Sequence, residues 1–224
     1  MRLGRLSRAA LATVTAAVAV CAPAAADREQ VRLVAADVTL AHHAVVRLAD
    51  LGDPTGWTGG GLEPPAPTSF QCGSYMAKQS DLVLTGNAAS KWSHSGLEFD
   101  SEAQVLRTRT MVELDWKRTI THTGVVECLR QKFASGLPAG QKLVSFVPMA
   151  FPKIAKLSAA FRGLVDVTSG ATTVRVLVDV VVVAAGRVEL TLITTAPYSA
   201  RAPVLNAELR LAQVMAARAQ PGAA

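Results

Sequence analysis

Residues 151–195 place the strongest constraint on the fold, because they predict three consecutive strands. Apolar and polar side chains alternate from 155 to 168 and again from 187 to 195, and nearly every residue from 173 to 183 is β-branched. Alternation with a period of two is typical of a strand that buries one face. Short glycine-containing segments separate the three stretches. We therefore expect three antiparallel strands joined by tight turns.

The apolar pattern also predicts a register, because a slip of one residue would exchange the two faces of a strand. A two-residue turn after the first strand places Val165 opposite Val174. A three-residue turn after the second strand places Val182 opposite Val188. The even-numbered valines of the middle strand would then form the core face.

The other face of this block mixes charged and apolar side chains. Arg175 should lie diagonal to Asp166, and Arg162 diagonal to Asp179, so two ion pairs are within reach. The pairs are interpreted as surface contacts of small energetic value, with an anion-binding patch as the alternative. Leu177 shares this face, which is too apolar to stand bare and needs a helix or a partner as cover. If the chain binds a ligand, Arg162, Arg175, Leu177 and Asp179 are the predicted binding residues.

The first 26 residues are typical of a secretory signal peptide. Three arginines precede an apolar run at 9–20, and three alanines end at Ala26, just before Asp27. The protein is therefore expected to be secreted or held in the cell envelope. A lipid anchor at Cys21 is the alternative, although Val20 before it fits a lipoprotein signal poorly.

Residues 27–219 are expected to form one α+β domain, an antiparallel sheet flanked by helices, with a disordered tail at 220–224. Helices are predicted near 37–48, after Thr108, at 123–135 and from Pro203 to 219, where caps and apolar spacing favour them. No segment after the signal peptide is long and apolar enough to span a membrane. A loop is expected where glycines and prolines gather, at 59–67.

Charge and cysteine content narrow the class of protein. The formal net charge of +6 falls to about +3 once the three arginines of the signal peptide are removed, which is too little to favour nucleic acid. Cys72 and Cys128 are the cysteines that remain after the signal peptide. In an exported protein they are expected to form one disulfide.

The chain carries no motif of a known catalytic centre. There is no G-x-S-x-G, S-x-x-K or H-E-x-x-H, and no spacing that predicts a metal site or a cofactor. Of the four histidines, His94 alone lies near acidic residues, Glu98 and Asp100, across a turn. No catalytic residue is therefore assigned.

Scattered landmarks resemble a loose group of uncharacterised exported actinobacterial proteins. These landmarks are Asp50-Leu51, Gly56-Trp57, Cys72, Ser80-Asp81-Leu82, Thr85-Gly86, Cys128-Leu129, Ala160-Phe161-Arg162, Asp179-Val180-Val181, Gly186-Arg187, Leu211-Ala212 and Met215-Ala216-Ala217-Arg218. The group is similar in layout to the extracellular sensor domains of mycobacterial Ser/Thr kinases and to PsbP-like lipoproteins. The resemblance implies a sheet flanked by helices and a binding role outside the membrane. This chain is expected to differ from the kinase sensors in having only one possible disulfide, no transmembrane helix and no kinase domain, so no ligand residues are transferred from them.

Two functions from different classes follow. The first is a non-catalytic, sensor-like binding domain of the cell envelope or extracellular space, with an envelope component or a small molecule as its partner. The second is a small secreted hydrolase, for which His94 would be the candidate acid or base.

Overall fold

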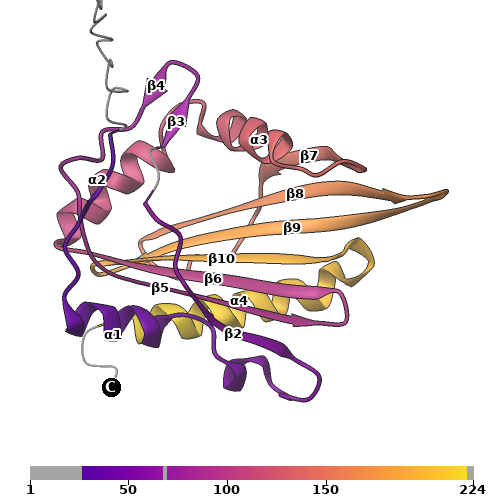
Figure 1. The fold of residues 1–224 in the computed structure, drawn as a ribbon, viewed down its shortest axis with the longest axis horizontal. Coiled ribbons are helices and arrows are strands. Elements are labelled where there is room, and N and C mark those ends of the chain that lie inside the picture. The colour runs from indigo at the N-terminus through magenta and orange to yellow at the C-terminus, as the bar shows by residue number, and fades with distance from the viewer. Residues whose placement is uncertain (1–26, 68–69, 221–224) are drawn as a thin grey trace, which may run out of the picture.

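The computed structural model describes residues 27–67 and 70–220 (Figure 1). The predicted signal peptide, the alternative anchor at Cys21 and residues 221–224 of the predicted tail lie outside the described residues. Within them the chain has an α+β fold, a mostly antiparallel mixed sheet flanked by four helices. None of these helices is long and apolar enough to cross a membrane.

The main sheet has the strand order β1-β5-β6-β10-β9-β8-β7, and β2 also pairs with β5. Neighbouring strands are antiparallel except β1 and β5, which are parallel. In this strand order β6 and β10 lie in the middle of the sheet. The strands are β1 (Gln30–Val31), β2 (Thr58–Leu62), β5 (Val83–His94), β6 (Leu97–Leu106), β7 (Gln141–Pro148), β8 (Leu157–Ser169), β9 (Thr172–Ala185) and β10 (Val188–Pro197).

The helices cover the sheet on both faces (Figure 1). α1 packs on β5 and β6, and α4 packs on β9 and β10, so these two helices form one outer layer. α2 packs on β6 and β10 and α3 on β7, on the opposite face. The helical segments are α1 (Ala35–Ala44), α2 (Arg109–Thr119), α3 (Val125–Ser135), α4 (Arg201–Arg218) and two 3-10 turns, η1 (Leu48–Leu51) and η2 (Tyr198–Ala200).

The three-strand block is confirmed as β8, β9 and β10, but its predicted register is wrong. Val165 pairs with Val176, two residues beyond Val174. The shift arises because the turn is Gly170-Ala171, which places glycine at the first central position with φ +59°. A type II′ turn needs positive φ at this position, and its twist matches that of the flanking strands.

The second turn is also a two-residue turn, Gly186-Arg187, with φ +63° at Gly186. Val188 therefore pairs with Ala185, and Val182 pairs with Thr191. Replacing the predicted three-residue turn with a two-residue turn changes which faces of β9 and β10 coincide.

As a result, the predicted core face is wrong too. The odd-numbered side chains of β9 are the fully buried ones, with Leu177, Val181 and Val183 at 0–2% exposure, whereas the even-numbered valines from Val176 to Val182 are half-buried and Val174 is exposed. The face that needed a cover receives it from α1 and α4, whose Ala41, Leu211, Ala212 and Met215 pack into the same core cluster.

β2 forms where a loop was expected from the glycine run. Gly59 pairs with Trp92 of β5 at φ +133°. A Cβ at residue 59 would lie 2.0 Å from the carbonyl oxygen of Lys91, so glycine alone allows this close approach of the two backbones.

Gly59→Ala is therefore expected to destabilise the protein by about 1–3 kcal/mol through backbone strain at this position. Gly61→Ala on the same strand is the matched control, because its Cβ would meet the Ala89 carbonyl oxygen at 4.0 Å. Urea denaturation of both variants measures the difference, and equal losses would show that the approach at Gly59 is not limiting.

The predicted disulfide would connect the short hairpin of β3 (Gln71–Cys72) and β4 (Tyr75–Met76) with α3. Cys128 on α3 is buried, and its Sγ lies 3.7 Å from the carbonyl oxygen of Gln71, the neighbour of Cys72. The side chain of Cys72 lies outside the described part of the structure, so the disulfide stays a prediction.

Candidate functional site

Three of the four residues predicted to bind a ligand, Arg162, Arg175 and Asp179, take part in two ion pairs between β8 and β9. Arg162 lies directly opposite Asp179, and Arg175 directly opposite Asp166, rather than diagonally as predicted. Each arginine binds its partner through two nitrogens, with Arg162 Nε 2.7 Å from Asp179 Oδ1 and Arg175 Nε 2.8 Å from Asp166 Oδ1. Both predicted pairs are therefore present, with a corrected register.

The two pairs differ sharply in burial. Asp179 is fully buried, and Leu177 is fully buried against Ala196 and Val204. Arg175 belongs to the exposed pair, with 46% of its side chain accessible. The helix α4 thus covers Leu177 and Asp179, so an external ligand has no access to either residue.

The opposite face of the sheet holds a cavity of about 330 Å³, here called the acidic pocket. Its floor is made by Glu102 and Gln104 of β6, Glu189 and Thr191 of β10, and Val182 of β9. These residues meet because β6 and β10 are neighbours in register, with Glu102 paired to Thr191 and Gln104 to Glu189.

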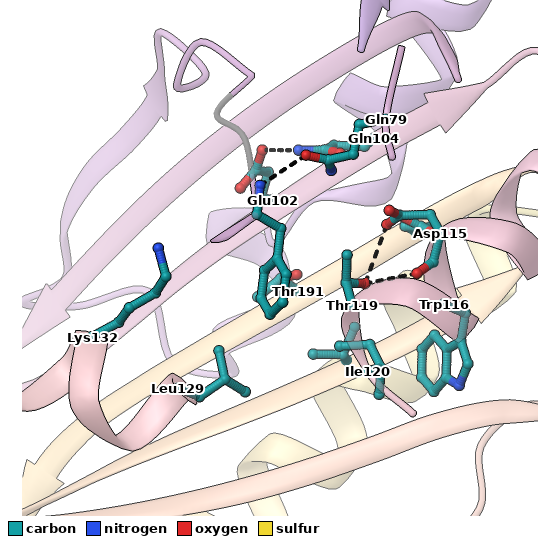
Figure 2. Close-up of a pocket in the computed structure, with 13 residues that line it drawn as sticks. Gln79, Glu102, Gln104, Asp115, Trp116, Thr119, Ile120, Leu129, Lys132 and Thr191 are labelled. Atoms are coloured by element: carbon teal, nitrogen blue, oxygen red, sulfur yellow. Dashed lines mark hydrogen bonds between the residues drawn. The ribbon is translucent and has the colours of Figure 1, made fainter. Parts of the chain in front are cut away.

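The other walls come from two helices and the segment before β5 (Figure 2). Trp116 and Ile120 approach from α2 and the residue after it, and Leu129 from α3. Phe70 also lines the cavity, so apolar side chains form much of its walls. Lys132 of α3 lies on the opposite side of the pocket from Asp115 (Figure 2).

Asp115 of α2 and Glu189 of β10 bring two carboxyl groups into this cavity. Asp115 is 8% exposed, and its Oδ2 accepts a hydrogen bond from the Thr119 hydroxyl at 3.4 Å. Asp115 Oδ1 and Glu189 Oε1 are buried atoms for which the described residues provide no hydrogen-bond donor. A proton shared between the two carboxyl groups would satisfy both oxygens.

The protonation of this pair follows from its surroundings. Burial raises the pKa of Glu189 well above its usual range, and the charge of Asp115 and a hydrogen bond to it add to the shift. Burial also raises the pKa of Asp115, while the contact with Glu189 opposes the rise. Glu189 is therefore the partner that holds the proton and donates it towards Asp115.

Two further acids, Glu29 and Glu102, lie near the pair, and the charge of Glu29 helps to raise the pKa of Glu189. Burial raises the pKa of Glu29, just before β1, to about 7, and the charges of Asp115 and Glu102 contribute. Its Oε2 is likewise buried without a donor among the described residues. Burial raises the pKa of Glu102 as well, although the amide of Gln104 donates a hydrogen bond to it at 2.7 Å.

These four carboxyl groups receive little compensation from basic residues. Within residues 27–67 and 70–220, no lysine or arginine forms a salt bridge with Glu29, Glu102, Asp115 or Glu189. The same residues show no group of three or more His, Cys, Asp or Glu arranged to hold a metal ion. The pocket therefore gathers carboxyl groups that have no salt-bridge partner among the described residues.

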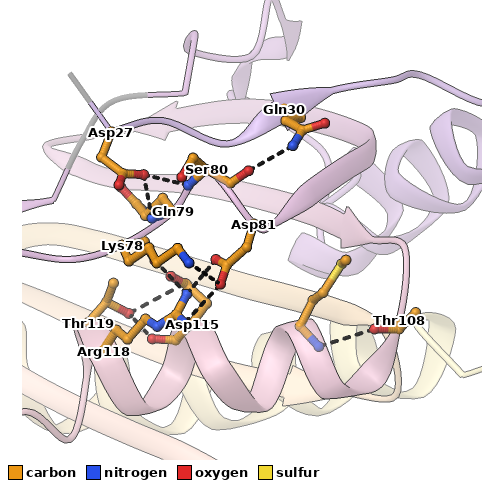
Figure 3. A network of polar contacts seen from close by, with 11 residues as sticks. Asp27, Gln30, Lys78, Gln79, Ser80, Asp81, Thr108, Asp115, Arg118 and Thr119 are labelled. Atoms are coloured by element: carbon orange, nitrogen blue, oxygen red, sulfur yellow. Dashed lines mark hydrogen bonds and ion pairs between the residues drawn. The ribbon is translucent and has the colours of Figure 1, made fainter. Parts of the chain in front are cut away.

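A polar network holds α2 and the segment before β5 in place (Figure 3). Arg118 near the end of α2 binds Asp81 through two hydrogen bonds of 2.7 and 3.1 Å. Thr108 caps the start of the helix, its Oγ1 accepting from the Met111 backbone N–H at 3.2 Å. Asp27 accepts from the backbone N–H of Gln79 at 2.7 Å, which holds the segment before β5 in place.

His94, the candidate of the hydrolase alternative, lies far along the sheet at the β5–β6 turn. It packs edge-on against Trp57 at 5.2 Å between ring centroids. Lys91 forms salt bridges with both Glu98 and Asp100, so these acids are engaged by a lysine. The structure brings His94 close to neither member of the Asp115–Glu189 pair, since it lines a separate surface hollow.

The acidic pocket was missed by the sequence analysis, although one signal was present. Glu98, Asp100, Glu102 and Gln104 alternate along β6 and therefore share one face. An acidic face on a strand in the middle of a covered sheet has few routes to solvent.

Comparison with protein-family models, with curated proteins and with solved structures finds no match to this chain.

Proposed function

We propose that the protein is an exported, non-catalytic binding domain of the cell envelope or extracellular space, and that the acidic pocket is its ligand site. The observation that supports this most directly is the Asp115–Glu189 pair, two buried carboxyl groups at the wall of an open cavity, each with one buried oxygen that no donor of the described residues reaches. Leaving such groups unpaired costs stability. A fold that retains them has a use for them at this place.

The size and walls of the cavity agree with a small-molecule ligand. A volume of about 330 Å³ lies within the usual range for small-molecule sites. Apolar walls with a few convergent polar groups are typical of such sites. Export and the Cys72–Cys128 disulfide, which would connect the β3–β4 hairpin with α3, belong to the same proposal.

A fragment screen by thermal shift tests the proposal. A fragment at ten times its Kd should raise the melting temperature by about 3–6 °C. The shift should disappear in Thr191→Phe, which fills the pocket floor, and in Asp115→Asn. It should persist in Glu113→Gln, which changes an exposed acid on the same helix. Fragments that bind equally well to all four proteins would place the ligand site elsewhere.

A small secreted hydrolase is the second candidate, favoured by the same carboxyl pair. Two acids whose surroundings separate their pKa values can serve as acid and base. Turnover of ester, amide or glycoside substrates, lost in both Asp115→Asn and Glu189→Gln, would favour this function over binding alone. Binding without turnover in the unmodified protein favours the first proposal.

A further inference from the structure

We infer that the ligand of the acidic pocket is an organic monocation, a protonated amine attached to a compact apolar body, whose ammonium group binds between Asp115 and Glu189. This inference rests on the proposed function, because it names the class of ligand for the same site. The positive charge of the ligand goes beyond the proposed function, since a binding pocket of this size could hold a neutral or anionic molecule instead.

Buried carboxyl oxygens that lack hydrogen-bond donors support an ammonium group as the part of the ligand that binds here. Asp115 Oδ1, Glu189 Oε1 and Glu29 Oε2 are acceptors without donors among the described residues. A primary ammonium carries three N–H donors and no acceptor. Its hydrogen bonds to carboxylates are charge-assisted and therefore stronger than those a neutral hydroxyl could form.

The apolar walls define the rest of the ligand. Phe70, Trp116, Ile120 and Leu129 line the cavity beyond the carboxyl pair and provide contact area for a hydrocarbon body. Lys132 lies across the pocket from Asp115 (Figure 2). Its positive charge disfavours a second ammonium at that end, so a single positive charge fits best.

An anion and a metal ion fit this pocket less well. An anion would meet Glu102, Asp115 and Glu189, with Glu29 near them and only Lys132 to oppose them at the wall. A metal ion would require a convergent set of three or more ligands, which the described residues do not form here.

Binding of a cation should release a proton. In the empty pocket the carboxyl pair holds a proton between Glu189 and Asp115, and the ammonium group takes its place. The Glu189 O–H bond then breaks and the proton passes to solvent. Affinity should therefore rise with pH for as long as Glu189 holds its proton in the unliganded protein. The other charged groups around the pair are Glu29 before β1, Glu102 on β6, Arg118 on α2 and Lys132 on α3.

The experiment compares three probes of nearly the same shape by isothermal titration calorimetry. The probes are cyclohexylmethylamine, cyclohexylmethanol and cyclohexanecarboxylate, which are cationic, neutral and anionic at pH 7. We expect the amine to bind about tenfold or more tightly than the alcohol, a difference of about 1.4 kcal/mol. The carboxylate should bind most weakly.

Measurements at pH 6 and 7, in buffers of different ionisation enthalpy, count the proton that binding releases. The affinity of the amine should increase several-fold between these pH values. Asp115→Asn and Glu189→Gln should each remove most of its advantage over the alcohol, whereas Glu113→Gln should leave it unchanged.

The outcomes separate the ligand class from the site. If the alcohol or the carboxylate binds as well as the amine, and Thr191→Phe abolishes that binding, the inference is wrong but the pocket remains a ligand site. If the amine binds with no preference between the unmodified protein and the two pocket variants, both the inference and the site are wrong. Failure of all three probes at millimolar concentration also overturns the inference.

Discussion

Replacing Arg162 with methionine is expected to destabilise the protein by about 3–5 kcal/mol, because it leaves a buried charge without its partner. Asp179 is fully buried, and the two hydrogen bonds from Arg162 are its charged contacts from β8. Methionine keeps the length of the side chain, so lost packing contributes little. Urea denaturation monitored by circular dichroism measures the free energy of unfolding.

Arg175→Met is a matched control for this prediction. It breaks an arginine–aspartate pair between the same two strands, held by hydrogen bonds of 2.8 and 3.0 Å, on the same face of the sheet. This second pair is exposed to solvent, so water replaces the lost contacts and the stability should change little. Comparable losses in the two variants would show that burial of Asp179 does not decide the cost.

The comparison of these two pairs shows what the sequence could predict. Cross-strand contacts of opposite charge between β8 and β9 were expected from the alternation of residue types, and they are present. Their unequal burial was not predictable from that alternation, since it depends on where α4 lies. The amphipathic spacing of residues 203–219 did predict a helix that covers one face of the sheet, and α4 is that helix.

The register and the core face were not predictable for a different reason. β9 carries valines on both faces, so a run of β-branched residues gives no preference for one face over the other. The choice then depends on the turns. Gly170 and Gly186 each occupy the first central position of a two-residue turn, and this detail shifts every pairing in the block.

The acidic pocket depends on topology that no local pattern contains. Asp115 lies on the buried side of α2 with Val112 and Trp116, whereas Leu114 on that helix is exposed. In the sequence, Glu189 has the pattern of an ordinary polar residue on the solvent side of an alternating strand. Its burial follows from the position of β10 between β6 and β9, which the local pattern does not reveal. Residues separated by 74 positions along the chain meet only in the folded protein.

Glu208 lies fully buried on α4, in the apolar spacing of Val204, Leu211 and Met215. Burial raises the pKa of Glu208 to about 8, and the charge of nearby Asp179 adds to the shift. Thr194 and Arg162 act in the opposite direction and offset part of it. Glu208 is therefore a neutral acid at the interface between α4 and the sheet through most of the physiological pH range.

Glu208→Gln should consequently alter how stability depends on pH. Below about pH 4 the carboxyl is protonated in both the folded and the unfolded chain, so it contributes no slope. Between about pH 4.3 and 8 the unfolded chain loses the proton while the folded chain keeps it. The free energy of unfolding therefore falls as pH rises through this window, and Glu208 contributes about 3–5 kcal/mol of that fall.

The glutamine variant has no proton to lose and should lack this part of the fall. Denaturation at pH 5 and pH 8.5 should show that the stability of the variant relative to the unmodified protein improves by about 3–5 kcal/mol between the two values. The raised pKa values of Glu29, Asp115 and Glu189 act with the same sign, but both proteins share them, so they cancel in the difference. Glu113→Gln, on the exposed side of α2, provides the surface control. A variant whose pH profile runs parallel to that of the unmodified protein would mean that Glu208 is already ionised in the folded state, and that Arg162 compensates two buried acids rather than one.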